Sequence, residues 1–422
     1  MDKSLSYNRE IINWGYLLGY LGLFLVLPPI IGLPVVLYMV WKKNHPKYSD
    51  YLLLMACIAI YLGSINATKQ PSGDQVNYYV AYMNVPDIGF LKSLIYIYGV
   101  DYYVDSGKVN ISGEFMNGVY NYIGYYLTFG YYPLFAALYT FVEYLMIYLG
   151  LYKVFRKAQM PKYPIVCGVL TLSFFYLFFQ YTMQIQKQFF AQAIMMYVLG
   201  SYAEKGKMTI RLWLIALCSI LTHASTGLFL PFLLLKPLRG RLNKKWMAFI
   251  ALMLFAFILY GPRMAENVAS NNSGVAGYGM KRFAESEGQA DLASELVMSQ
   301  ILVIAVPMFI IVFRQLWLKR HIFIDKAQAF ILNIALLLLL SVASMYSKPL
   351  AQYRYFMMLL AFMPFVYPFI SSIVSKRNQW LMIISLVMVV WFYGKFSFIV
   401  WSYASEWQIL VYPPVGLIAK GF

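Results

Sequence analysis

Long apolar stretches alternate with short polar joints along almost the whole chain. A helix needs roughly 20 apolar residues to cross a bilayer, and we count twelve candidate stretches. Backbone in contact with lipid must satisfy its own hydrogen bonds, so each stretch is expected to be helical. The pattern therefore predicts an all-α polytopic membrane protein with about 12 transmembrane helices. The candidate spans are residues 14–41, 51–68, 131–152, 164–182, 187–203, 209–224, 225–237, 246–262, 298–314, 327–346, 352–374 and 379–399.

The first stretch is too long for one straight helix, and it contains four residues that disturb helices. Proline removes a backbone donor and clashes with the preceding turn, and sharp kinks are found at such positions. We predict a kink or a break there, with two short re-entrant pieces as the alternative. The four residues are Pro28, Pro29, Gly32 and Pro34.

Two joints are much longer than the others, at residues 69–130 and 263–297. Loops of this length are usually functional or disordered. The first contains a Tyr-rich stretch from Asn117 to Leu127 that predicts an amphipathic helix, and the second ends in a plausible helix from Ala284 to Val297. We predict that residues 1–422 form a single integral membrane domain with both loops on its non-cytoplasmic side.

Basic residues are concentrated in alternate joints. Six joints hold 21 of the 34 Lys and Arg residues and only three acidic residues. Cytoplasmic loops carry such an excess, so we predict that these joints face the cytoplasm and that both termini lie on the other side. Because topology accounts for the net charge of +17, no nucleic-acid partner is expected. The six joints are residues 41–50, 151–163, 204–211, 236–246, 314–326 and 375–378.

The three cysteines all lie inside apolar stretches, at Cys57, Cys167 and Cys218. This placement makes a disulfide framework or a metal cluster unlikely to be the basis of the fold. The N-terminal apolar run continues to Trp41 without a small-residue cleavage site, so it predicts an uncleaved span.

Polar residues gather where spans end on the predicted non-cytoplasmic side. On a helix, Lys187 and Gln188 share a face with Ala191 and Gln192 at three- and four-residue spacing, which directs Lys187 into a bundle. The four groups are Gly73-Asp74 with Tyr78 and Tyr82; Gly113-Glu114; Gln184, Gln186, Lys187, Gln188 and Gln192; and His223, Ser225 and Thr226 in a tight turn with Gln352 and Arg354. Further external cations are Arg263, Lys281 and Arg282.

Each group also has a purely structural explanation. Lys and Arg at span ends commonly reach the head groups, a single His in a turn is more often structural, and a carboxylate in a loop is ordinarily solvated. Glu143 differs because it lies near the middle of a span, where ionisable groups mark a site or a buried partner. A protonated, hydrogen-bonded carboxyl is the alternative there. The convergence of cations, carboxylates and a His at one membrane level favours a site.

Such an arrangement suits the transfer of a sugar that is linked through pyrophosphate to a lipid. Pyrophosphate is a good leaving group, so fixed cations such as Lys187 and Arg354 would supply the electrostatic stabilisation that is needed. The attacking sugar hydroxyl needs a base, for which His223, Asp74 and Glu114 are candidates. The donor already stores the energy, and the sequence has no Walker loop, Asp-x-Asp pair or His-Glu-x-x-His motif. We predict a metal-independent reaction without a cofactor.

Five short motifs stand in order between about residue 50 and residue 360. They are Gly73-Asp74-Gln75-Val76-Asn77-Tyr78, Glu114 ahead of an aromatic helix, Gln184-Ile185-Gln186-Lys187-Gln188-Phe189-Phe190-Ala191-Gln192-Ala193-Ile194, Leu221-Thr222-His223-Ala224-Ser225 and Gln352-Tyr353-Arg354-Tyr355-Phe356. In these motifs the chain resembles bacterial polysaccharide polymerases of the EpsG/Wzy type, which are related in architecture to O-antigen ligases and GT-C glycosyltransferases. It departs at Lys187, where the family usually has Arg, and at Lys69, where an Arg is common. Lys keeps the charge but loses the planar fork of Arg.

The resemblance implies a polymerase of undecaprenyl-pyrophosphate-linked oligosaccharide repeat units at the outer face of the bacterial plasma (inner) membrane. It would extend O-antigen, capsule or exopolysaccharide chains by inverting glycosyl transfer. Its partners would be the lipid-linked donor and acceptor, membrane lipids and, as a further candidate, a membrane protein that regulates chain length. The implied roles are pyrophosphate binding for Lys187, Arg354 and Lys69; catalysis for Asp74, His223 and Glu114; and substrate binding for Tyr78, Gln184, Gln188, Arg263, Lys281 and Arg282.

Two alternatives stay open from the sequence. A ligase would use the same chemistry to move a finished glycan onto another lipid or a protein. A transporter for the lipid-linked unit belongs to a different class, and Glu143 with Lys187 would then form a gated ion pair. Many transporter folds contain internal repeats, and we find none at the residue level, which favours the polymerase.

Overall fold

The computed structural model of the chain describes residues 12–95, 115–240, 295–318, 326–345, 349–372, 375–396 and 403–421, with scattered positions between 242 and 260. All regular elements among these residues are helices, without a strand, which confirms the predicted all-α class. The elements are α1 (Trp14–Val26), α2 (Pro29–Lys42), α3 (Tyr48–Asn66), α4 (Asp74–Met83), α5 (Val85–Ile95), α7 (Met116–Leu127), α8 (Tyr132–Lys157), α9 (Lys162–Ser173), α10 (Tyr176–Thr182), α11 (Gln186–Lys205), α12 (Ile210–Thr222), η1 (Ala224–Phe229), α13 (Leu230–Leu234), η2 (Lys236–Arg239), α16 (Glu295–Phe313), η5 (Arg314–Leu318), α17 (Lys326–Ser344), α18 (Pro349–Val366), η6 (Tyr367–Ser372), α19 (Arg377–Phe396), α20 (Glu406–Val411) and α21 (Pro414–Ala419).

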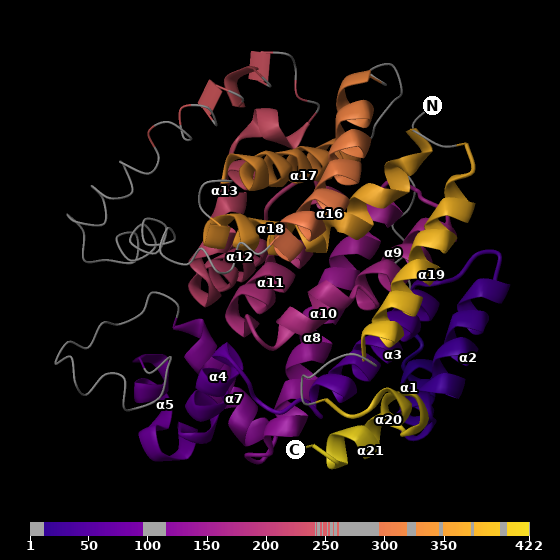
Figure 1. Ribbon diagram of the computed structural model, residues 1–422, viewed down its shortest axis with the longest axis vertical. Coiled ribbons are helices and arrows are strands. Elements are labelled where there is room, and N and C mark those ends of the chain that lie inside the picture. Colours follow the sequence, from indigo (N-terminus) through magenta and orange to yellow (C-terminus); the bar gives the residue numbers. More distant parts are fainter. Residues whose placement is uncertain are drawn as a thin grey trace.

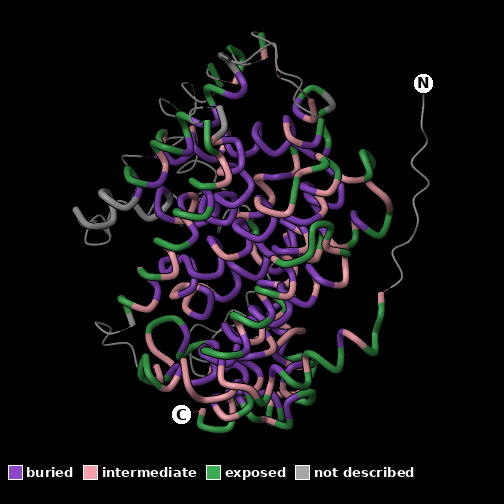
Figure 2. Tube along the Cα trace, turned by 90° about the vertical axis from the view of Figure 1, so that its right-hand side faces the viewer, coloured by how far each residue is buried: buried purple, intermediate pink, exposed green. Residues whose placement is uncertain are grey.

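The centre of the bundle is built from α3, α8 and α11 (Figure 1). Glycines let these helices approach closely, as is common where helices pack in membranes. A Cβ atom at Gly200 would collide with the backbone of Gly150, and one at Gly63 would lie 2.5 Å from the carbonyl oxygen of Ala137. Figure 2 shows buried segments throughout the interior and exposed segments along the margins.

The contacts also fix the directions of these helices. The Tyr139 hydroxyl of α8 donates to the Gln186 carbonyl at the start of α11 (3.4 Å), and Gly150 meets Gly200 further along both helices, so α8 and α11 run parallel. Asn66, the last residue of α3, donates to Thr140 near the start of α8 (3.0 Å), so α3 runs in the opposite direction.

Three of the basic joints meet at one end of the bundle. Lys162 Nζ donates to the carbonyl oxygens of Trp41 (2.6 Å) and Lys43 (2.9 Å), and Lys153 forms an ion pair with Glu204 (3.2 Å). We call this the basic end. The opposite end, where Asn66, Tyr132, Gln186 and Thr222 lie at the ends of their helices, is called the site end.

Four helices of the described residues are long and apolar enough to cross a membrane, or five if α9 and α10 form one bent span. Further apolar helices are shorter, among them α1, α2 and α12. A multi-pass membrane protein is therefore supported, whereas the number of about 12 spans stays a prediction. The four helices are Tyr48–Asn66, Tyr132–Lys157, Lys326–Ser344 and Gln352–Ile370.

The first predicted span is broken, as its prolines indicate. α1 ends at Val26, Leu27 is extended, and α2 begins at Pro29 with Pro28 as its N-cap residue. Proline at the first helical position suits a helix start because no backbone donor is needed there. A second break, between α9 and α10, bends the chain by 58°. The sequence predicted one continuous span there, over residues 164–182. The predicted span at 225–237 is made of the short elements η1, α13 and the start of η2.

The predicted loop at 69–130 contains α4 and α5 in addition to the expected helix, which is α7. These three helices lie together at the site end (Figure 1). α7 and α8 are joined by a short turn in which Phe129 and Gly130 have φ of 54° and 75°. The second predicted loop, at 263–297, lies outside the described residues up to Glu295.

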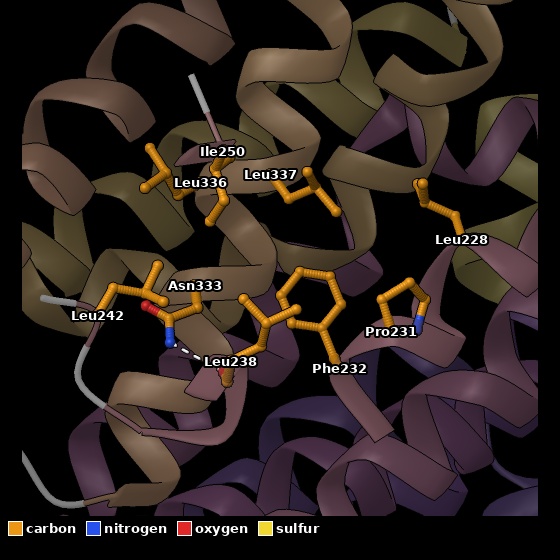
Figure 3. Close-up of a pocket in the computed structure, with 9 residues that line it drawn as sticks. All are labelled: Leu228, Pro231, Phe232, Leu238, Leu242, Ile250, Asn333, Leu336 and Leu337. Carbon is orange, nitrogen blue, oxygen red and sulfur yellow. Dashed lines mark hydrogen bonds between the residues drawn. The ribbon is translucent and has the colours of Figure 1, made fainter. Parts of the chain in front are cut away.

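An apolar pocket of about 250 Å³ lies between α13, η2 and α17 (Figure 3). Its polar lining residue is Asn333, whose side-chain amide donates to the carbonyl oxygens of Leu238 (3.0 Å) and Gly240 (2.6 Å). The amide therefore holds η2 against α17. No titratable group of the described residues lines this pocket, so it offers neither an acid nor a base.

Candidate functional site

The first two turns of α11 form the meeting point of the site end. Their residues from Gln186 to Gln192 are all buried, although most apolar spans begin with exposed polar residues at an interface. α8, α12 and α18 each contact this segment through a hydrogen bond. A polar helix start that is enclosed on several sides can present its side chains to a ligand rather than to solvent.

Lys187, in the first turn of α11, and Arg354, in the second turn of α18, lie at the same level of neighbouring helices. The side-chain amide of Gln188 donates to the carbonyl oxygen of Arg354 (3.1 Å), and one turn later Gln192 donates to that of Met358 (2.7 Å). Equal steps along both helices show that α11 and α18 run parallel and in register. Lys187 is only 5% exposed, and Arg354 is half-buried. Two sequence-predicted cations, 167 positions apart in the chain, are thus brought to one level.

The turn that carries His223 is fastened to the same helix. Ser219 Oγ donates to the carbonyl oxygen of Ala191 (2.7 Å) and to Thr226 Oγ1 (3.0 Å), and Thr226 Oγ1 donates to the carbonyl oxygen of His223 (3.0 Å). Ala191 lies one helical turn after Lys187. The His turn therefore lies beside the segment that bears the buried lysine.

Local hydrogen bonds determine which nitrogen of His223 carries a proton. His223 caps the start of η1, and its Nδ1 accepts a hydrogen bond from the backbone N–H of Ser225 (3.3 Å). The Ser225 hydroxyl lies 2.6 Å from the same nitrogen. Because a backbone N–H can only donate, Nδ1 is the acceptor and the neutral ring bears its proton on Nε2. In this arrangement Nε2 is a hydrogen-bond donor, whereas the sequence suggested a base.

Lys69 is enclosed at the end of α3. It is 1% exposed, and its Nζ lies 5.7 Å from the ring of Tyr403. The segment of Tyr403 covers this end of α3, because Tyr403 donates to Asn66 (3.3 Å) and the backbone N–H of Ala404 donates to Thr68 (3.0 Å). Burial lowers the pKa of Lys69 to about 7, since removal of water disfavours the ammonium form.

We expect this burial to make diphosphate binding depend on pH if Lys69 contacts the anion. Below pH 7 the lysine binds as an ammonium, whereas above pH 7 it must first take up a proton, so affinity should fall by up to about tenfold per pH unit. The measurement is the Kd of a pyrophosphate lipid between pH 6 and pH 9. Lys69→Met should flatten this slope, and an unchanged slope in that variant would remove Lys69 from the anion site.

The stability of the empty protein should change in the opposite direction. The unfolded lysine keeps its proton up to about pH 10.4, while the folded one loses it near pH 7. Folding therefore releases a proton between these values, and the Lys69 contribution to stability rises with pH in that window.

The Gly-Asp motif presents its residues in different directions. Asp74 is exposed in the first turn of α4, while Gln75 and Tyr78 are buried. A carboxylate in the first turn of a helix is also stabilised by the helix dipole, which is a structural role for Asp74. Gln184 is half-buried just before α11. The predictions for Glu114, Arg263, Lys281 and Arg282 lie outside the described residues.

Several buried polar side chains have unpartnered atoms, and two of them, Asn117 and Asn121, were not among the predicted site residues. Both carboxyl oxygens of Glu143 lack a hydrogen-bond partner among the described residues, as do the amide atoms of Gln186 and Asn117 and the Oδ1 atom of Asn121. Glu143 lies on the face of α8 between Tyr139 and Gly150, which both contact α11. Its depth was predicted, but the spacing of Asn117 and Asn121 by one turn was the overlooked signal.

A family model described as the EpsG family matches residues 94–413. This range covers well over half of the chain and includes α7, α8, α11, the His turn and Arg354, whereas Lys69, Asp74 and Tyr78 precede it. No curated protein and no solved structure matches the chain.

Proposed function

We propose, on the premise that this chain belongs to the EpsG family, that it polymerises lipid-linked oligosaccharide repeat units. Family membership confirms the resemblance seen in the motifs and indicates a membrane-bound polysaccharide polymerase or a related membrane function. The observation that carries the finer proposal is the enclosure of Lys187 at the start of α11, in register with Arg354 and beside the His223 turn.

In the proposed reaction, a hydroxyl oxygen of the acceptor sugar attacks the anomeric carbon of the donor. The bond between this carbon and the pyrophosphate oxygen breaks, and the lipid pyrophosphate leaves with the electron pair. Attack from the face opposite to the leaving group inverts the anomeric configuration. The hydroxyl proton passes to a base, for which the exposed carboxylate of Asp74 stays a candidate.

Lys187 and Arg354 would stabilise the charge that develops on the pyrophosphate. Fixed cations are effective in such a place because they act in a poorly hydrated site and need no reorganisation during the reaction. His223 Nε2–H would add a third donor to the leaving group. These groups require neither a metal nor a cofactor for this part of the chemistry.

The charge distribution supports an orientation for the reaction. Cytoplasmic loops carry the excess of Lys and Arg, so we place the basic end at the cytoplasm. The site end then faces outward, where undecaprenyl-pyrophosphate-linked units would be joined at the outer face of a bacterial plasma membrane.

The decisive experiment uses the purified protein in detergent with a lipid-linked repeat unit as both donor and acceptor. We expect a ladder of longer glycans together with released lipid pyrophosphate. Transfer of a single glycan to a different lipid or to a protein would instead identify a ligase. Failure to form a product, combined with movement of the unit across liposome membranes, would identify a transporter.

A further inference from the structure

One face of α7, which we call its inner face, contacts both α8 and α11. Gly124 of α7 packs on the ring of Phe135, where a Cβ atom would not fit. One turn earlier, the ring of Tyr120 lies 4.9 Å from that of Phe190, which in turn lies 4.2 Å from the ring of Tyr139. Asn117 and Asn121 lie on the same inner face as Tyr120 and Gly124, because three- and four-residue spacing brings these positions together on a helix.

A hydrogen bond joins α7 to the His turn. The Tyr120 hydroxyl lies 3.1 Å from Thr222 Oγ1, and Thr222 immediately precedes His223. α7 therefore lies beside the turn that carries His223 and beside the start of α11. A ligand that lies against the inner face of α7 can reach the reacting groups.

Two buried side chains on this face have amide atoms without a hydrogen-bond partner among the described residues. Asn117 is 1% exposed and Asn121 is 3% exposed. The Nδ2 and Oδ1 atoms of Asn117 and the Oδ1 atom of Asn121 have no hydrogen-bond partner among the described residues. Such atoms destabilise a fold unless something binds them, and a leucine would fill a purely structural position better.

The chemistry of this wall is neutral and rich in hydroxyl groups. No Lys, Arg, Asp or Glu occurs from residue 116 to residue 142. The Tyr139 hydroxyl lies within electrostatic range of Tyr78, Tyr120 and Tyr132, and of Glu143 beneath them. In contrast, a second wall, formed by α11 and α18, carries the cations Lys187 and Arg354. A diphosphate fits the second wall and not the first.

We propose that the inner face of α7, through Asn117 and Asn121, binds sugar hydroxyls of the glycan substrate, with Tyr120 and Tyr139 as its aromatic side. A carboxamide offers a donor and an acceptor side by side, which match the hydroxyl groups of a sugar ring. Aromatic rings supply apolar contact area with a polar handle. The inference rests on the proposed function for the identity of the glycan, and it assigns α7 the recognition of sugars.

The test replaces each amide by an apolar residue of similar size, Asn117→Leu and Asn121→Leu. Removal of buried unpartnered atoms should leave the melting temperature of the purified protein unchanged or raise it. The same changes should weaken binding of a lipid-free oligosaccharide, released from the surface glycan of the source organism, by about tenfold or more. Binding is measured by calorimetry, independently of turnover.

Asn333→Leu is the matched control, because its amide donates to two carbonyl oxygens that would both lose their partner. Figure 3 shows the bond to Leu238. This variant should lower the melting temperature, and among the folded molecules it should leave oligosaccharide affinity unchanged. A loss of melting temperature in the α7 variants like that in Asn333→Leu would overturn the proposal, since the amides would then be structural. Unchanged oligosaccharide affinity in both α7 variants would overturn it as well.

The outcome is separable from that of the proposed polymerase activity. If the wild-type protein binds the oligosaccharide through Asn117 and Asn121 but forms no ladder, the sugar-binding role of α7 holds and the polymerase activity is refuted. If both leucine variants form normal ladders, the polymerase activity holds and the sugar-binding role of α7 is refuted.

Discussion

Lys187→Ala protein is expected to reach the membrane and to lose chain extension by roughly 10²–10³-fold, the effect of removing one fixed electrostatic contact to a developing negative charge. The lysine is enclosed at the first turn of α11, so neighbouring water cannot replace its charge. The measurement is the rate of glycan elongation by purified protein with a lipid-linked donor.

Two further variants separate charge from shape and from general damage to the helix. Lys187→Arg should keep much of the activity, because it retains the charge at a position where the family usually has Arg. Lys205→Ala changes the same helix at its last turn, at the basic end, and should have no effect on elongation. Near-normal elongation by Lys187→Ala would remove the lysine from the pyrophosphate site.

Replacement of His223 should have the second large effect. His223→Ala is expected to slow elongation by about 10²-fold, at the lower end of what positioned proton-transfer or donor groups contribute. Because Nδ1 accepts from the Ser225 backbone N–H, the ring presents Nε2–H as a donor. Higher pH should therefore not restore the Ala variant, whereas His223→Gln, which keeps a side-chain N–H, should recover part of the rate.

A contrary result would restore the sequence-based role of His223. If elevated pH rescues His223→Ala and Gln gives no recovery, the ring acts as a base for the acceptor hydroxyl. Ser225→Ala is the control, since it removes the hydroxyl at Nδ1 but keeps the backbone N–H that sets the tautomer.

The apolar pattern predicted the helical class, and the prolines predicted the break between α1 and α2, because these features depend on local chemistry. The 58° bend between α9 and α10 was not predictable in the same way. The break at Phe174 and Phe175 contains neither proline nor glycine, so tertiary packing of these buried residues determines it. α4 and α5 were likewise not predicted, because they lie within the polar loop at residues 69–130.

The candidate site shows the same division. The buried position of Lys187 was predictable, because its spacing to Gln and Ala neighbours lies within a single helix. The register of α11 with α18, through Gln188 and Arg354, depends on two segments far apart in sequence. The tautomer of His223 depends on the backbone geometry of η1, which side-chain identities alone do not encode.

The placement of Asn117 and Asn121 on a helix of their own has an evolutionary consequence. Both amides lie on α7 (Met116–Leu127), whereas Lys187 and Arg354 lie on α11 and α18. Exchange of α7 between relatives should transfer the preference for one glycan over another, while Lys187 and Arg354 stay unchanged. Differences in glycan preference between relatives would then arise from substitutions within the 12 residues of α7.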